Sequence, residues 1–215
     1  MQHLSHSFPE KRGLLRQTVS SSPVLQNINL VIQPQEIVGL VGESGCGKST
    51  LARLLLRIYE PTSGQIRFAG EDIHKFKARE YYGRVQMIFQ DPFSSLNPKL
   101  KIGFLLREMW NLHQPESATT AKLNKLLDEV GLPANALDKY AHEFSGGQRQ
   151  RIAIARALAA SPEMLVADEP VSALDVSIQA QILKLLQQLR KERNLTLLFI
   201  SHDLAVVDQL CDRIL

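Results

Sequence analysis

The sequence predicts an α/β fold with a mostly parallel sheet and an inserted helical lobe, and three observations carry this prediction. Short apolar runs typical of buried strands recur at 37–41, 86–89, 164–167 and 195–200. Helical patterns separate these runs, as the crossovers between parallel strands require. Between 92 and 140 the apolar runs stop and helical periodicity replaces them. We therefore place the inserted lobe at about 91–161.

One core with an inserted lobe fits the size of the chain, because 215 residues are too few for two ordinary independent domains. With 44% hydrophobic and 22% charged residues, the composition is that of an ordinary globular protein and excludes a disordered or collagen-like chain. Two cysteines, Cys46 and Cys211, are too few for a disulfide framework and lack metal-ligand spacing. We expect both to be reduced thiols.

Charge and hydropathy restrict the partners and the cellular location expected for the protein. The net charge of +3 is far from the concentrated basic face of nucleic-acid-binding proteins, so no nucleic acid partner is expected. No apolar stretch approaches the roughly 18 residues that cross a bilayer. The first residues lack the apolar region and cleavage site of a secretory signal. A cytoplasmic location is the resulting expectation.

The individual elements follow from local patterns. Residues 24–41 alternate apolar and polar positions and then turn continuously apolar, which predicts an exposed strand followed by a buried one at 37–41. The helical pattern at 123–130 ends at Gly131 and Pro133, which predicts a helix of the inserted lobe. After the lobe, an amphipathic helix is predicted from the spacing of Ile178, Ile182, Leu185, Leu186 and Leu189.

A glycine-rich segment between the strand at 37–41 and a helix starting near Ser49 predicts a phosphate-binding loop. It reads Gly42-Glu43-Ser44-Gly45-Cys46-Gly47-Lys48-Ser49-Thr50 and matches the pattern G-x-x-x-x-G-K-[S/T]. The glycines let backbone N–H groups point at a triphosphate, Lys48 reaches the β- and γ-phosphates, and Ser49 can ligate Mg²⁺. A turn that binds nothing is the alternative. The loop alone does not decide between kinases, GTPases and ATPases.

Two adjacent carboxylates end the apolar strand at 164–167. Asp168 and Glu169 therefore follow a buried strand directly. At such a strand end Asp168 can hold a metal ion through its water shell, and Glu169 can orient or deprotonate an attacking water. A charged strand end without a role in chemistry is the alternative for this pair.

A further motif begins at Ser145. This residue is a good helix N-cap, and Gly146 and Gly147 expose backbone N–H groups at the start of an amphipathic helix. Such a helix start can bind an anion. The chain thus carries two predicted phosphate-binding helix N-termini, although a capped surface helix would also fit the spacing of this second one.

With these motifs in this order, the sequence resembles the nucleotide-binding subunits of ATP-binding cassette (ABC) transporters over essentially its whole length. By this resemblance Ser145-Gly146-Gly147-Gln148 is the signature motif, which closes over the γ-phosphate held by the phosphate loop of a second subunit. Gln90 is the glutamine that senses Mg²⁺ and the attacking water. Ser172-Ala-Leu-Asp175 is the D-loop, and His202 is the switch histidine that contacts the γ-phosphate.

The resemblance implies an ATPase that binds ATP and Mg²⁺ between two subunits arranged head to tail. The residues that it implies in catalysis are Lys48, Gln90, Glu169 and His202. Those that it implies as Mg²⁺ ligands are Ser49, Gln90 and Asp168. Nucleotide binding is implied for the phosphate loop, the signature motif and Asp175. Phe8, the aromatic residue before the phosphate loop, is the candidate for stacking on adenine.

The layout of such a subunit follows from the same resemblance. Residues 1–215 would form a single ABC ATPase domain. Its P-loop ATPase core, with a mostly parallel sheet and an N-terminal antiparallel β part, would comprise 1–90 and 162–215, and the helical subdomain would comprise about 91–161. Family members continue beyond Leu215 with further strands. The C-terminal edge of the domain is therefore expected to be missing from this sequence.

Two segments are similar to the importer branch that handles oligopeptides, dipeptides and nickel. They are Asp91-Pro-Phe-Ser-Ser-Leu-Asn-Pro98 and residues 13–19. This branch implies a second ATPase subunit, related or identical, together with two membrane permeases and an extracytoplasmic solute-binding protein. It also implies a peripheral location on the inner face of the cell membrane. The permeases would dock near residues 90–98 and the helical lobe.

Two other functions remain as alternatives. One is an ABC ATPase that acts on nucleic acid or ribosomes, although such relatives usually carry a long coiled-coil insertion or two cassettes in one chain. The other is a catalytically silent regulatory subunit that binds ATP. The second fits poorly, because Lys48, Asp168, Glu169 and His202 are all present.

Overall fold

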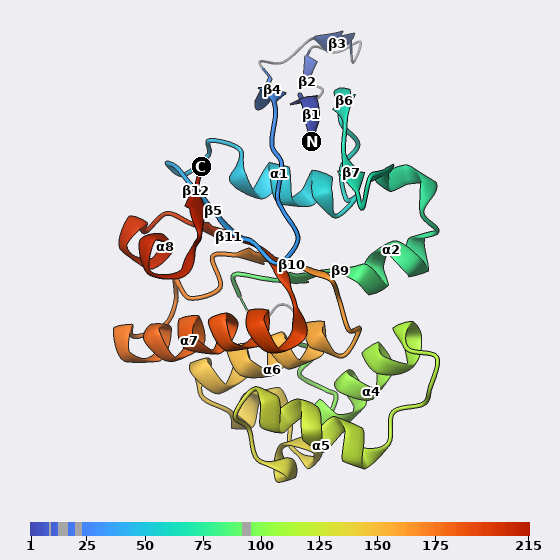
Figure 1. Ribbon diagram of the computed structural model, residues 1–215, viewed down its shortest axis with the longest axis vertical. Coiled ribbons are helices and arrows are strands. Elements are labelled where there is room, and N and C mark those ends of the chain that lie inside the picture. The colour runs from blue at the N-terminus through green and yellow to red at the C-terminus, as the bar shows by residue number, and fades with distance from the viewer. Residues whose placement is uncertain (9, 13–16, 20–22, 92–95) are drawn as a thin grey trace. The chain divides into compact units, whose positions relative to one another are not determined.

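A computed structural model describes the chain except for residues 9, 13–16, 20–22 and 92–95 (Figure 1). Parts of both segments that resemble the importer branch therefore lie outside the described residues. The chain forms two compact units. The β unit comprises Met1–Ile32 and Gly42–Lys77, and the main unit comprises Gln33–Val41 and Ala78–Leu215. Among the described residues, no helix combines the length and the apolar character needed to span a bilayer.

The β unit is antiparallel, as the resemblance implied. Its three-stranded sheet has the order β4-β1-β6. The bounds of these strands are Gln2–His6 for β1, Leu25–Ile28 for β4 and Ser63–Gln65 for β6. Two further antiparallel pairs join β2 (Glu10–Arg12) with β3 (Gln17–Val19), and β7 (Arg67–Phe68) with β8 (Glu71–Asp72). The helices are α1 (Lys48–Leu55) and the short 3₁₀ helix η1 (Ile73–Lys75).

The main unit contains a five-stranded parallel sheet with the order β12-β5-β11-β10-β9. Its strands are β5 (Ile37–Val41), β9 (Val85–Ile88), β10 (Met164–Asp168), β11 (Thr196–Ser201) and β12 (Arg213–Ile214). The four strands predicted from apolar runs are confirmed to within one residue. The edge strand β12 was not predicted, because it is two residues long and both residues are exposed.

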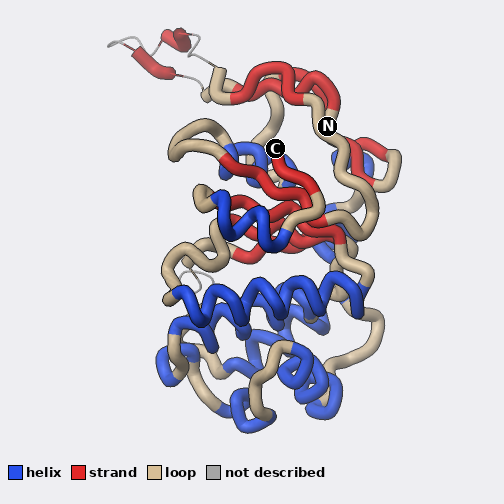
Figure 2. The backbone as a smooth tube through the Cα atoms, turned by 60° about the vertical axis from the view of Figure 1, so that its left-hand side comes forward, coloured by secondary structure: helices blue, strands red, loops and turns tan. Residues whose placement is uncertain are grey.

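Beside the sheet, the described part of the main unit contains helices, and several of them fall in the predicted inserted lobe. The α-helices are α2 (Ala78–Arg84), α4 (Ile102–His113), α5 (Thr120–Glu129), α6 (Gly146–Leu158), α7 (Val176–Arg193) and α8 (Leu204–Leu210). The 3₁₀ helices are η2 (Ala134–Asp138) and η3 (Ala141–Glu143). In Figures 1 and 2 the helices α4, α5, α6 and α7 lie together on one side of the parallel sheet.

One hydrophobic core joins this sheet to its helices. Leu165 and Ala167 of β10 and Leu197 and Phe199 of β11 point to the same face, because side chains alternate along a strand. All four are fully or almost fully buried in the same cluster as the inner positions of α4 to α8. Burying each large side chain contributes about 1.5–3 kcal/mol. The buried side chains thus hold β10 and β11 in place, and with them the residues that follow each strand.

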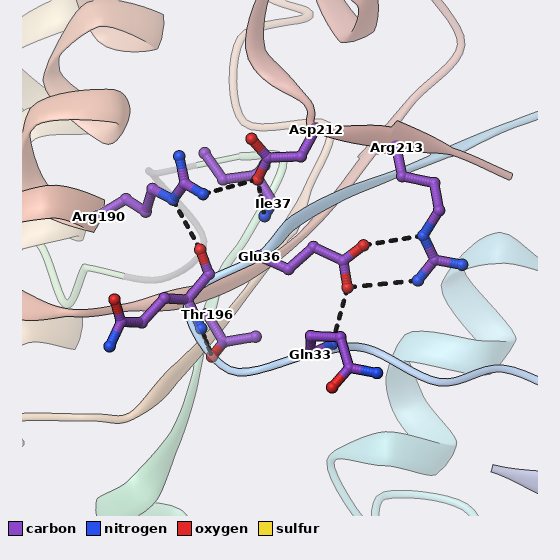
Figure 3. Close-up of polar contacts among 8 residues, drawn as sticks. Gln33, Glu36, Ile37, Arg190, Thr196, Asp212 and Arg213 are labelled. Atoms are coloured by element: carbon purple, nitrogen blue, oxygen red, sulfur yellow. Dashed lines mark hydrogen bonds and ion pairs between the residues drawn. The ribbon is translucent and has the colours of Figure 1, made fainter.

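At the edge of the sheet, an ion pair joins β12 to the residue that precedes β5. Arg213 of β12 donates from Nε to Glu36 Oε1 at 2.8 Å, and Glu36 Oε2 also accepts from the Gln33 backbone N–H at 2.7 Å (Figure 3). The hydrogen bond from Arg213 lowers the pKa of Glu36 below its ordinary value. Because Arg213 is well exposed, the pair contributes little stability by itself.

A second set of contacts next to it ties the end of α7 to the start of β5. Asp212 Oδ2 accepts hydrogen bonds from the Ile37 backbone N–H at 2.8 Å and from Arg190 Nη2 at 2.9 Å (Figure 3). Arg190 also donates from Nε to the Gln35 carbonyl oxygen at 2.7 Å. These contacts satisfy two backbone groups, the Ile37 N–H and the Gln35 carbonyl, in addition to pairing two charges. These contacts therefore hold the edge strand in register more firmly than the ion pair alone.

Gly39 of β5 is required by a close approach of α8. A Cβ at this position would lie 2.2 Å from Val207 Cγ1 and 2.9 Å from Cys211 Sγ. The thiol of Cys211 is packed tightly enough that burial raises its pKa to about 12. We expect Gly39→Ala to destabilise the protein by about 1–3 kcal/mol, the usual cost of overpacking a core. Denaturant unfolding of the purified variant measures this loss.

The matched control for Gly39→Ala is the double variant Gly39→Ala/Val207→Ala. Removing the clashing methyl group should make the double variant more stable than the sum of the two single effects predicts. Strict additivity of the two effects would show that the contact with Val207 is not the cause.

His113, in the last turn of α4, predicts a pH dependence of stability. Its Nδ1 is buried without a hydrogen-bond partner among the described residues. Burial is the main cause that lowers its pKa below the ordinary value of 6.5, with a further lowering by the charge of Arg79, while a backbone hydrogen bond at Arg79 opposes the shift. The folded protein therefore disfavours the protonated ring. Stability is complete above the unfolded pKa and falls as the pH drops from 6.5 toward the lowered value.

Unfolding free energies at pH 7.5 and 5.5 test this effect against the variant His113→Gln. The wild type should lose more stability on acidification than the variant does. Equal losses in the two proteins would assign the acid sensitivity to other groups.

Candidate functional site

The phosphate loop lies in the β unit and holds its lysine inward. Lys48 is the first residue of α1 and is only 8% exposed. Its Nζ donates hydrogen bonds to the backbone carbonyl oxygens of Gly42 at 2.6 Å and Glu43 at 2.8 Å. An ammonium group is thus fixed inside the loop, next to the positive end of a helix. This arrangement favours an anion over the loop.

The glycines of the loop have the conformations that a phosphate-binding turn needs. Gly45 and Gly47 have φ angles of +86° and +104°, which glycine adopts without strain. A Cβ on Gly47 would lie 2.7 Å from Leu25 Cδ2. A Cβ on Gly45 would meet no described atom within 4 Å, so this side of the loop is open. The loop therefore offers backbone N–H groups, one cation and open space, which together fit a triphosphate.

A cluster around the Glu169 carboxylate lies in the main unit, at the ends of three neighbouring strands. Gln90 follows β9 by two residues, Glu169 follows β10 directly and His202 follows β11 directly. Gln90 Nε2 donates to Glu169 Oε2 at 3.2 Å, and His202 Nδ1 lies 3.2 Å from the same oxygen. The sequence placed these residues at strand ends, and the parallel sheet brings them together because its carboxyl ends share one edge.

The carboxylate of Glu169 is partly shielded and keeps capacity for a further contact. Its side chain is 20% exposed, whereas that of His202 is 59% exposed. Both contacts fall on Oε2, so among the described residues Oε1 keeps its lone pairs for a water molecule. A carboxylate partner also favours a proton on Nδ1 of His202. The cluster is thus suited to orient water and accept a proton.

Asp168 lies one residue before this cluster, as the last residue of β10. It pairs with Ile200 of β11 in the parallel ladder. Glu169, the next residue, lies outside the strand and has a left-handed backbone with a φ angle of +48°. Two adjacent carboxylates at a strand end are suited to two different roles, one holding a metal ion and the other orienting water.

The signature motif forms the capped start of α6. Ser145 Oγ accepts from the Gln148 backbone N–H at 3.4 Å, and Gln148 Oε1 accepts from the Ser145 backbone N–H at 3.1 Å. This reciprocal capping box confirms the predicted N-cap. Ser145, Gly146 and Gln148 are exposed. The helix start is therefore accessible to a ligand from outside.

The two glycines of the signature motif pack against the segment that follows Glu169. A Cβ on Gly147 would lie 2.5 Å from Cγ2 of Ile178, in the first turn of α7. A Cβ on Gly146 would lie 3.4 Å from Leu174 Cδ2, which is ordinary contact. Only glycine therefore fits at 147 without a shift of the Ile178 side chain or of α7. Asp175, the exposed N-cap of α7, lies between these two contacts in the chain.

Phe8 lies in the β unit within a small group of rings. Its ring is 40% exposed and meets His6 edge-on at 4.7 Å and Tyr59 edge-on at 5.3 Å between centroids. One face of a half-exposed ring can still accept a nucleobase, so the adenine contact stays a prediction. His6 and Tyr59 were not predicted as its supports. No local pattern links Phe8 to Tyr59, because the two residues are distant in the chain and lie in segments that flank the paired strands β1 and β6.

Comparison with known proteins shows the class to which this fold and these motifs belong. The family model described as ABC transporter matches residues 25–172, more than half of the chain. The chain belongs to the ABC transporter family. The match includes the phosphate loop, the signature motif and the Asp168–Glu169 pair.

Relatives of known name cover nearly the whole chain. A Brucella ovis protein whose name proposes a peptide-import ATP-binding role is 52% identical over an alignment 212 residues long, which covers 95% of this chain and 67% of that protein. The oligopeptide transport ATP-binding protein AppF of Bacillus subtilis is 48% identical over 96% of this chain and 65% of its own length. The chain thus spans about two thirds of the length of these relatives.

Solved structures confirm the fold. The dimeric structure of the bacterial ABC transporter cassette MJ0796 matches with a TM-score of 0.79 and 26% identity, covering 99% of this chain and 91% of that one. The same values are found for a dimer of that cassette in a post-hydrolysis state bound to ADP and Pi. The fold predicted from the sequence is therefore confirmed. As a member of this family, the chain is an ATPase.

Proposed function

We propose that this chain is the ATP-binding and ATP-hydrolysing subunit that energises a peptide importer. One observation carries the hydrolytic part of the proposal. Glu169 Oε2 is contacted by both Gln90 and His202, so the cluster presents one carboxylate oriented by an amide and an imidazole. A chain that only bound nucleotide would have no use for this arrangement.

The proposed roles of the site residues follow from their chemistry. Lys48 would hold the β- and γ-phosphates, and the N–H groups of the phosphate loop would surround them. Ser49, Gln90 and Asp168 would hold Mg²⁺, which when bound neutralises the phosphate oxygens. Glu169 would orient the attacking water and take its proton, while His202 would hold the γ-phosphate.

Hydrolysis would require two subunits arranged head to tail. The exposed signature motif from Ser145 to Gln148 would close over the ATP held by the partner's phosphate loop. ATP binding would then join the subunits and hydrolysis would release them. The dimeric cassette among the solved structures supports this proposal, and the second subunit can be another copy or a related ATPase.

We assign the solute to peptides rather than nickel, because the relatives reported above carry peptide or oligopeptide in their names. The proposed partners are two membrane permeases, with an extracytoplasmic solute-binding protein acting through them. The chain would then lie on the inner face of the membrane. Permease docking would use the helical lobe and residues 90–98, of which 92–95 are outside the described residues.

Phosphate release from Mg²⁺-ATP by the purified chain tests the enzymatic part. Turnover above that of the Glu169→Gln variant supports the proposal. ATP binding without turnover, by the chain alone and with added permeases, would instead support the silent regulatory subunit.

Co-purification and uptake test the transport part. The chain should co-purify with the two membrane permeases of the importer. Vesicles reconstituted with the complete importer should take up a labelled oligopeptide and not Ni²⁺. Co-purification with nucleic acid or ribosomes instead would support the alternative outside transport.

A further inference from the structure

The turn that follows Glu169 contains a hydroxyl group aimed at the backbone of this residue. Ser172 Oγ donates a hydrogen bond to the Glu169 carbonyl oxygen at 3.1 Å. The Ser172 backbone N–H donates to the same oxygen at 3.3 Å. The sequence marked Ser172 only as the first residue of the D-loop and assigned it no function.

These contacts define a β-turn from Glu169 to Ser172. Pro170 occupies its second position, where the fixed φ of proline is favoured. The third residue, Val171, is 3% exposed and packs in the core of the main unit. Ser172 itself is exposed, so packing does not explain its side chain. Its hydroxyl serves the turn through the bond to Glu169.

Glu169 needs such support because its backbone is strained. Its φ angle is +48°, in the left-handed region that a residue with a Cβ disfavours. The proline that follows restricts this residue further. On the other side, the Glu169 backbone N–H donates to the Ile200 carbonyl oxygen at 2.9 Å. Glu169 is therefore clamped at both backbone ends, by β11 and by Ser172.

We propose that Ser172 is a positioning residue for ATP hydrolysis, whose hydroxyl holds Glu169 in the left-handed conformation that directs its carboxylate to Gln90 and His202. Without the hydroxyl, the Glu169 carbonyl oxygen keeps only the Ser172 backbone N–H as a donor, so extended backbone angles become more populated and the carboxylate is directed to its two partners less of the time. The inference rests on the proposed ATPase function. It adds a residue that touches neither nucleotide nor water and acts only through Glu169.

The first test compares Ser172→Ala, Ser172→Thr and the wild type in steady-state ATP hydrolysis. Ser172→Ala should lower kcat about fivefold, the rate equivalent of one ordinary hydrogen bond, with an unchanged KM for ATP. Ser172→Thr keeps the hydroxyl and should restore kcat. The matched control is Ser117→Ala, which removes an exposed serine in the loop before α5 and should leave kcat unchanged.

A double-mutant cycle with Glu169→Gln decides whether Ser172 acts through Glu169. In single-turnover hydrolysis, adding Ser172→Ala to Glu169→Gln should cause no further loss. An equal fivefold loss in both backgrounds would overturn the proposal. So would a weakened ATP-dependent dimer in the Glu169→Gln background, because Ser172 would then act on the nucleotide or on the partner subunit.

The result for the wild type separates this inference from the proposed function. If the wild type does not hydrolyse ATP, the proposed function fails. If the wild type hydrolyses ATP and Ser172→Ala matches it in kcat, only the role of Ser172 is wrong.

Discussion

Glu169→Gln should stop ATP turnover and leave ATP binding intact. Glutamine keeps the size of the side chain and an oxygen that can accept the bond from Gln90. It cannot take a proton from the attacking water, and general-base assistance contributes on the order of 10²–10⁴ to a rate. We therefore expect kcat to fall at least about a hundredfold. With ATP bound and not hydrolysed, the variant should accumulate as a dimer, which size-exclusion chromatography in the presence of ATP detects.

The matched control is Glu163→Gln, the same change at the opposite end of β10. Glu163 forms an ion pair with Arg84 at 2.7 Å and has a side chain that is 57% exposed. Exposed pairs contribute little, so this variant should hydrolyse ATP at nearly the wild-type rate. Rapid hydrolysis by Glu169→Gln would remove Glu169 from the water-orienting role and leave the cluster without a base.

Lys48→Ala should weaken ATP binding strongly and abolish hydrolysis. The variant loses the cation inside the loop, and the carbonyl oxygens of Gly42 and Glu43 lose their donor. Each charge-assisted hydrogen bond to phosphate contributes about 1.5–3 kcal/mol, so the loss of two weakens ATP binding about a hundredfold or more. Equilibrium binding of a fluorescent ATP analogue measures the first effect, and phosphate release measures the second.

Lys75→Ala provides the control for a missing positive charge. Lys75 is an exposed lysine of the same unit, in η1, and its removal should leave ATP affinity within twofold of the wild type. Thermal unfolding of Lys48→Ala without nucleotide separates loss of binding from loss of folding. ATP affinity of the wild-type value in folded Lys48→Ala would assign phosphate binding to the backbone of the loop alone.

The parallel sheet could be predicted because its strands depend on local patterns. Buried strands are short apolar runs, and β5, β9, β10 and β11 each show one. In a parallel sheet the residues after each strand meet at one edge, which is where Gln90, Glu169 and His202 lie, whereas the roles of Gln90 and His202 come from the resemblance to the family. The apolar pattern thus also indicates where the residues of the cluster lie in the fold, at the ends of the strands.

Contacts between distant segments could not be predicted. The requirement for glycine at 39 arises from Val207, and the support of Phe8 comes from Tyr59. No periodicity marks these contacts, because each depends on how two elements pack. The left-handed backbone of Glu169 is a further example, since a glutamate before a proline gives no local signal for a positive φ angle.

The contact between Gly147 and Ile178 has a consequence for the evolution of the family. A Cβ at 147 would lie 2.5 Å from the Ile178 side chain. A larger residue at 147 therefore requires a smaller residue at 178. Relatives that carry alanine or serine at 147 should carry a smaller residue at 178. An alignment should therefore show covariation between the start of α6 and the first turn of α7, independent of any direct contact with nucleotide.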